Sequence, residues 1–260
     1  AKNIWCSLTW PIGEHFFTVQ PFEVDFRGRL TFPLLINNLL NAAGHHSNDR
    51  GFGIKQLNEN KKTWVLSRIA IELTRHPINA EKVKVQTWIE GLLRSFTLRN
   101  FTIIGEDNKI IGYARTIWAM IDSESRKPIN LTGMGLEQYV TAKDCPIDKA
   151  GKIVDPATGT TETFRVKYSD VDINQHLNSA KYVEHIIDAF TLHKFSKREI
   201  KRFEIEYIEE CMFGETITLQ KTELSKTEFI IILKKEDGSI ACKSRLLFTE
   251  QTFNDKYITD

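Results

Sequence analysis

The sequence predicts an α+β protein built as two similar halves in tandem, each an antiparallel β-sheet wrapped around one long α-helix. One observation behind this prediction is an internal repeat, in which a stretch near the start of the chain matches a stretch past its middle without gaps. The other is the content of each half, which holds a single amphipathic helical pattern and a series of alternating, strand-like segments.

The best-preserved part of the repeat precedes the helix of each half. Residues 17–30 (FTVQPFEVDFRGRL) lie over residues 164–177 (FRVKYSDVDINQHL), with Asp25 matched to Asp172. The segments that follow, 31–43 (TFPLLINNLLNAA) and 178–190 (NSAKYVEHIIDAF), carry apolar residues at spacings of three and four behind a capping-type residue. Each half is therefore expected to begin with a strand and continue into one amphipathic helix.

The strands of the two halves also match. Residues 71–85 lie over 205–219, and residues 106–115 (EDNKIIGYAR) lie over 236–245 (EDGSIACKSR). The last pair predicts a hairpin, since Asp-Asn and Asp-Gly are tight-turn dipeptides. With one helix and many strands in each half, the economical arrangement is a sheet that curls around the helix and buries its apolar stripe. This is the hotdog fold, present twice.

The Pro and Gly content of residues 144–159 marks a connection between the halves. We expect an N-terminal domain at 1–145, a linker at 146–160 and a C-terminal domain at 161–260. The first half also contains an insertion, residues 44–62, which is rich in Gly, Asn and charge and is expected to form a surface loop.

Composition excludes several function classes. The net charge of +1, from 35 basic and 34 acidic side chains, gives no global attraction to nucleic acid or anionic membranes. The four cysteines are scattered without a CxxC pair, so neither a metal site nor a disulfide scaffold is expected, and no cofactor is indicated. No apolar run approaches the roughly 18 residues of a membrane span, and the first residues resemble neither a signal nor a transit peptide. We expect a cytoplasmic protein, or a mature form already trimmed.

Candidate catalytic residues lie where the two copies differ. The unmatched pairs are Asn174 with Arg27, His176 with Arg29, Glu210 with His76, and Cys211 with Pro77. Asp172, Asn174 and His176 alternate along a short stretch that is expected to be extended, which would point them to one side just before a helix begins. Free N–H groups at that helix start could stabilise an oxyanion, and Glu210, expected on a neighbouring strand, could take a proton from water.

The sequence resembles the acyl-acyl carrier protein thioesterases of plants and bacteria. The motifs that carry the resemblance are DINQHLNSAKYVEHIID at 172–188, IEYIEEC at 205–211, GFG at 51–53, TWVLSR at 63–68 and VQTWIEG at 85–91. The resemblance implies hydrolysis of fatty acyl-acyl carrier protein to free fatty acid and holo acyl carrier protein, which terminates fatty acid synthesis. It also implies a catalytic C-terminal half and an N-terminal half that supplies most of the acyl pocket. The plastid transit peptide of the plant members is absent, which fits a bacterial origin.

Carried over residue by residue, the family pattern falls on Asp172, Asn174, His176 and Glu210, with Cys211 beside them. One interpretation pairs Asn, His and Cys as in papain, and the other uses the carboxylates to activate water. We favour the carboxylates, because a Cys directly after a Glu on a strand points to the opposite face, although a bulge would undo this. Asp172 as a turn-former, His176 as a framework residue, Asn178 as a helix cap and Cys211 as a packed thiol are the structural alternatives.

The resemblance also suggests binding surfaces. Leu35, Leu39 and Trp64 are candidates for the acyl pocket, with packing in the core as the alternative. The densest basic stretch, residues 193–202, could dock the acidic carrier protein or form an ordinary solvated face; its cations are Lys194, Lys197, Arg198, Lys201 and Arg202. His45 and His46 are expected in a solvated loop rather than on a metal. Both a monomer and a homodimer are compatible with a double hotdog, which already mimics a hotdog dimer.

Two other functions remain open. Hotdog hydratases and dehydratases carry a motif like D-x-N-P-x-H, whereas here the Pro is missing and His176 comes one position early. A noncatalytic module that binds acyl thioesters would need the pocket but not the polar residues.

Overall fold

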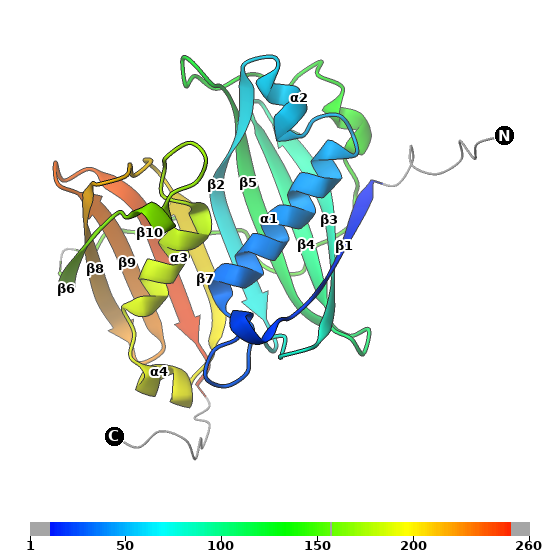
Figure 1. Ribbon diagram of the computed structural model, residues 1–260. Helices are drawn as coiled ribbons and strands as arrows, with labels where there is room; N and C mark the ends of the chain where they lie inside the picture. The colour runs from blue at the N-terminus through cyan, green and yellow to red at the C-terminus, as the bar shows by residue number, and fades with distance from the viewer. Residues whose placement is uncertain (1–10, 157, 251–260) are drawn as a thin grey trace.

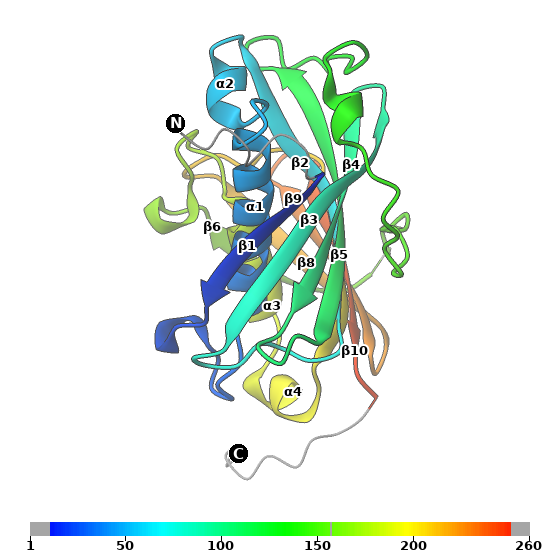
Figure 2. The ribbon, with the colours of Figure 1, turned by 90° about the vertical axis from the view of Figure 1, so that its right-hand side faces the viewer.

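The computed structural model describes residues 11–156 and 158–250, which form a ten-stranded sheet with the main helices on one face (Figures 1 and 2). Cys6 lies outside the described residues. The strands are β1 (Ile12–Thr18), β2 (Lys62–Leu73), β3 (Lys82–Leu93), β4 (Phe96–Ile104), β5 (Ile110–Asp122), β6 (Thr160–Arg165), β7 (Ile200–Tyr207), β8 (Thr216–Ser225), β9 (Glu228–Lys235) and β10 (Ile240–Phe248). The helices are α1 (Phe32–Asn48), α2 (Ile54–Asn58), α3 (Ser179–Asp188) and α4 (Leu192–Lys197), with short 3-10 turns at Pro21–Glu23, Leu136–Tyr139 and Tyr168–Asp170.

Each half contributes five strands to the sheet. The strand order is β1-β3-β4-β5-β2-β7-β10-β9-β8-β6, and the antiparallel pair β2–β7 joins the halves, from Arg68 opposite Glu206 to Glu72 opposite Arg202. Helices α1 and α3 pack beside each other on the same face (Figure 1). The prediction of an α+β double hotdog is confirmed, and the two sheets are continuous across the junction.

The turns preserve the internal repeat. The β4–β5 hairpin has Asn108 at φ 59°, and the β9–β10 hairpin has Gly238 at φ 85° in the matching place. In each turn the preceding aspartate, Asp107 or Asp237, accepts a hydrogen bond from the backbone N–H two residues later, at 3.1 and 2.9 Å. Asn and Gly are the residues that tolerate this left-handed conformation, which explains the dipeptides seen in the sequence.

The insertion in the first half differs from the expected surface loop. Residues 44–48 complete α1, residues 54–58 form α2, and Phe52 and Leu57 between and within these helices are buried. These two side chains pack into the N-terminal half, although Ile54 in α2 is exposed, so the insertion is a structural part of that half.

The connection between the halves has no helix or strand among its described residues between Val140 and Thr160. It nevertheless packs against the protein, because Cys145, Ile147 and Ile153 are buried. Within the described residues no helix is long and apolar enough to cross a membrane.

Candidate active site

Asp172 organises the loop that carries Asn174 and His176. Its Oδ1 accepts the backbone N–H of Asn174 at 2.8 Å and that of His176 at 3.3 Å. Val171 bridges to Leu177, and Gln175 adopts φ 65°, so the chain makes a tight loop between these two residues. The expectation of an extended stretch was therefore wrong, because the Asp172 carboxylate offers the backbone N–H groups a local partner.

The N-terminal half contains the same loop without the polar cluster. Asp25 Oδ1 accepts the N–H groups of Arg27 and Arg29 at 2.8 and 3.1 Å, and Gly28 at φ 73° takes the place of Gln175. An aspartate thus forms this loop in both halves. The turn-forming interpretation accounts for Asp172, which holds its neighbours in place.

Glu210 and His176 meet at the junction of the two halves. Glu210 lies after the end of β7, not on a strand as expected, and its Oε1 is 3.3 Å from His176 Nδ1. The same carboxylate oxygen forms an ion pair with Arg126, which belongs to the turn after β5 in the N-terminal half. The side chains of His176 and Glu210 are 22% and 39% exposed, so water can reach both.

Sequence reasoning missed Arg126. It is 84 residues from Glu210, and its hairpin lies outside the repeat matches on which the candidates were chosen. Only the fold shows that this arginine contacts the C-terminal half.

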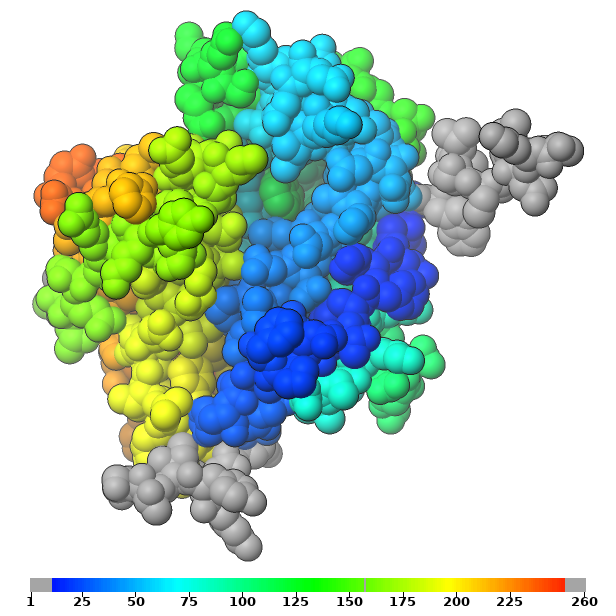
Figure 3. Space-filling model, viewed as in Figure 1, coloured from blue at the N-terminus to red at the C-terminus, as the bar shows by residue number. Residues whose placement is uncertain are grey.

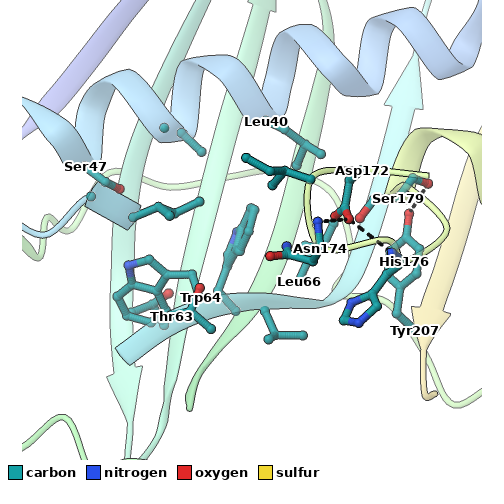
Figure 4. A pocket seen from close by; sticks show the side chains of 18 of the residues that line it. Leu40, Ser47, Thr63, Trp64, Leu66, Asp172, Asn174, His176, Ser179 and Tyr207 are labelled. Atoms are coloured by element: carbon teal, nitrogen blue, oxygen red, sulfur yellow. Dashed lines mark hydrogen bonds between the residues drawn. The ribbon is translucent and has the colours of Figure 1, made fainter. Parts of the chain in front are cut away.

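A cavity of about 1270 Å³ extends from this polar cluster beneath α1 and α2. Figure 3 shows the molecule hollowed between the blue and cyan α1–α2 segment and the yellow-green C-terminal half. In Figure 4, the loop with Asp172, Asn174 and His176 lies at one end of the cavity and Ser47 at the other. Leu40, Trp64 and Leu66 line the space between them, together with polar side chains such as Asn41 and Thr63.

The predicted pocket residues divide into wall and core. Trp64 lines the cavity and donates its indole N–H to the carbonyl of Phe52 at 3.0 Å. Leu35 and Leu39 are fully buried in the main core, so the prediction that they line the pocket was wrong. On α1 the neighbouring positions Leu40 and Ala43 face the cavity instead.

Asn178 caps α3 and occupies most of the free N–H groups there. Its Oδ1 accepts the N–H of Ala180 at 2.9 Å, and its carbonyl accepts those of Lys181 and Tyr182 at 2.8 and 3.1 Å. Among the described residues, the backbone N–H of Ser179 has no such acceptor, and Ser179 lines the cavity. The helix start therefore offers one backbone donor, and the Asn174 amide on the adjacent loop offers another.

The strand alternation expected for Glu210 and Cys211 does not apply, because neither residue lies on a strand, but within the described residues Cys211 does not line the cavity. Its side chain is fully buried in the main core, and burial raises the pKa of its thiol. Its backbone N–H donates to the hydroxyl of Tyr182 at 3.0 Å. The thiol is not part of the cavity wall among the described residues, and its protonated form is favoured at neutral pH.

The basic stretch is not one exposed surface. Arg202 is buried and forms ion pairs with Glu72 and Glu204, so its prediction as a docking residue was wrong. Lys194 lies over the Phe229 ring, 4.3 Å from its centroid, and is partly buried. The segment, which includes α4, lies at the far end of α3 from the loop with His176 (Figure 1).

The two adjacent histidines were also misplaced. Both belong to α1, and His46 is buried, with its Nε2 3.1 Å from the carbonyl oxygen of Pro11. His45 is exposed and stacks on His15. Within the described residues, no three His, Cys, Asp or Glu side chains are grouped to hold a metal ion.

Two family profiles match this chain. One described as "Acyl-ACP thioesterase N-terminal domain" matches residues 14–139, and one described as "Acyl-ACP thioesterase C-terminal domain" matches residues 154–250. The sequence is 22% identical over 250 residues to oleoyl-acyl carrier protein thioesterase 2, chloroplastic, of Arabidopsis thaliana, covering 88% of this chain and 68% of that protein. For the first three curated relatives, the chain spans from 51% to 68% of their length.

Solved structures show the same architecture. A crystal structure of an acyl-ACP thioesterase from Bacteroides thetaiotaomicron has a TM-score of 0.88 and 46% identity, covering 92% of this chain and 98% of that one. The 12:0-ACP thioesterase from Umbellularia californica has a TM-score of 0.81 at 19% identity, covering 94% and 99% of the two chains, which supports the fold alone.

Proposed function

This chain belongs to the acyl-ACP thioesterase family, and we propose that it hydrolyses fatty acyl-acyl carrier protein to free fatty acid and holo acyl carrier protein, which terminates fatty acid synthesis. The observation that carries this proposal is the pairing of Glu210 with His176 at one end of a long cavity that has apolar side chains along its wall. A carboxylate beside an imidazole can activate water there, while the cavity accommodates the hydrocarbon chain.

In the proposed mechanism, Glu210 takes a proton from a water molecule while the oxygen of that water attacks the thioester carbonyl carbon. The tetrahedral intermediate then collapses, the carbon–sulfur bond breaks, and the proton returns to the thiolate to give the free thiol. His176, 3.3 Å from the Glu210 carboxylate, positions the water and can relay that proton. The ion pair with Arg126 fixes the carboxylate toward the junction of the two halves.

The carbonyl oxygen becomes negatively charged in the intermediate and needs hydrogen-bond donors. The Asn174 amide and the Ser179 backbone N–H, both on the cavity wall, are the donors that we assign to it. Asp172 acts through them as a positioning residue, because its carboxylate is engaged by the backbone of the loop. Cys211 has no role in the chemistry, since it lies in the core.

The carrier protein should dock beside the cavity mouth, because the thioester must enter there. Lys61, whose side chain is 65% exposed and forms a surface ion pair with Glu124, and the exposed Lys127 flank the turn that holds Arg126. Ile173, on the Asp172 loop, is 97% exposed and adds an apolar contact point. An acidic carrier would be attracted by the cations and held by the apolar side chain.

The test is a panel of acyl-acyl carrier protein thioesters assayed for free thiol and free fatty acid together. We expect equal amounts of both products, and a Glu210→Gln variant that binds the substrate but releases little of either. A thioester recovered with water added across its chain would instead show a hydratase, and unchanged bound thioester would show a binding module.

A further inference from the structure

The cavity ends in a buried polar cluster that the proposed reaction does not use. Arg99, on β4, is 4% exposed and contributes to the cavity wall. Its guanidinium lies 3.2 Å from His46 Nδ1, 3.1 Å from Thr87 Oγ1 and 3.1 Å from Ser47 Oγ. An acyl pocket for a plain hydrocarbon has no need of a cation here, and burial of a charge is costly unless it is compensated.

No anion within the described residues compensates Arg99. Its three partners are neutral, and the one charged group among the described residues that shifts its pKa is another cation, Arg50. His46 is uncharged, since burial and then the neighbouring Arg99 lower its pKa to about 3. Its Nε2–H donates to the Pro11 carbonyl, which leaves Nδ1 to accept from Arg99.

The guanidinium itself remains cationic at neutral pH. Burial, followed by repulsion from Arg50, lowers the pKa of Arg99 to about 9. The three hydrogen bonds use three of the five N–H donors of an arginine, so two donors have no acceptor among the described residues. Planar guanidinium groups suit paired oxygen acceptors, and carboxylates most of all.

The cluster lies where the end of an acyl chain would reach. Ser47, which contacts Arg99, is at the opposite end of the cavity from His176 in Figure 4. With the thioester carbonyl at Asn174 and His176, the chain passes Leu40 and Leu66 before it meets the cluster. A methyl terminus would face the guanidinium without forming a hydrogen bond, whereas an oxygen would complete the arginine's bonding.

We propose that Arg99 binds an oxygen at the far end of the substrate's acyl chain, so that the preferred substrates are ω-oxygenated acyl thioesters, with a terminal carboxylate bound best. This inference rests on the proposed hydrolysis for its orientation of the chain. Arg99 is then a specificity-determining residue, remote from the reacting carbon.

The kinetic test compares methyl-, hydroxyl- and carboxyl-terminated acyl thioesters over a series of chain lengths. At the best length we expect wild-type kcat/KM for the carboxyl-terminated chain to exceed that for the methyl-terminated chain by about tenfold or more. Arg99→Met should reverse the preference, while Arg99→Lys should keep part of it. A wild-type preference for methyl-terminated chains at every length, or a preference unchanged in Arg99→Met, would overturn the proposal.

A binding test remains decisive if Arg99→Met does not fold. The melting temperature of the wild-type protein is measured with free α,ω-dicarboxylic acids and with monocarboxylic acids of equal length. A larger stabilisation by the dicarboxylic acids supports the cluster as an oxygen site, and equal stabilisation at all lengths argues against it. This assay needs no turnover, so failure of every thioester to be hydrolysed would count against the proposed function and leave the binding result to decide the inference.

Discussion

Glu210 belongs to the C-terminal half, yet its ion pair is with Arg126 of the N-terminal half. The carboxylate that we assign as the general base is thus fixed by both halves, and the cavity wall also contains residues of both, such as Ser123 and Asn174. This relationship explains why one half carries the loop with His176 while the other must be present for the site to be complete.

Glu210→Gln should lower kcat by roughly 10² to 10⁴, the scale of general-base catalysis, because the amide cannot accept the proton of water. KM should change little, since the side chain keeps its size. Steady-state assays on one acyl-acyl carrier protein measure both quantities. Arg126→Gln serves as the matched variant: it leaves the carboxylate in place but removes its ion pair, and a milder loss is expected. Full activity in Glu210→Gln would remove the water-activation mechanism.

Cys211→Ser and Cys211→Ala should keep most of the activity, because the thiol is packed in the core and does not line the cavity. The cost should appear in stability as a small decrease in melting temperature, due to the lost volume in Cys211→Ala and the buried hydroxyl in Cys211→Ser. Mass spectrometry of the wild-type enzyme during turnover is the second measurement. An acyl group trapped on Cys211 would establish a covalent mechanism in its place.

The repeat made the architecture predictable from sequence. Matching strands, helices and the Asp-Asn and Asp-Gly turns indicated two copies of one fold, and a duplicated pattern constrains topology more strongly than local propensity does. The continuous pairing of β2 with β7 was not visible, because no local signal marks which sheet edges join.

The candidate site was predictable only in part. Comparing the copies pointed to Asn174, His176 and Glu210, which the fold brings to one cavity. It could not place Leu39 in the core and Leu40 on the cavity wall, since both are apolar residues of one helix and only the tertiary packing shows which side of the helix meets the cavity. Arg99 gave no signal either, because a lone arginine in a strand reads as an exposed residue until burial is known.

Asp172→Asn and Asp25→Asn form a matched pair, because each aspartate holds the same loop in its own half. Both substitutions should lower the free energy of unfolding by about 1 to 3 kcal/mol, as hydrogen bonds to a charged acceptor weaken. Only Asp172→Asn should also lower kcat, since its loop carries Asn174 and His176. Chemical denaturation and steady-state kinetics separate the two effects. Equal losses of activity in both variants would mean that stability alone is responsible.

Leu40→Phe should shift the preferred acyl chain to a shorter length, because a larger side chain fills part of the cavity. Leu39→Ala is its control on the same helix: it should cost about 2 to 5 kcal/mol of stability through a core cavity and leave the preferred length unchanged. Product profiles by gas chromatography, together with thermal melts, measure both. If Leu40→Phe only destabilises the protein, the chain does not pass along α1.

The docking proposal is tested by reversing charges at two places. Lys61→Glu with Lys127→Glu changes the cavity mouth, and Lys197→Glu with Lys201→Glu changes the segment at the far end of α3. That ten-residue helix alone spans about 15 Å, so only the first pair lies beside the thioester's point of entry.

We expect the mouth variant to raise KM for the carrier-bound substrate by about tenfold while KM for a small acyl thioester stays the same. The second variant should behave as wild type with both substrates. If the second variant instead raised KM for the carrier-bound substrate alone, docking would lie on the segment that includes α4. The carrier would then have to reach the cavity mouth along the length of α3.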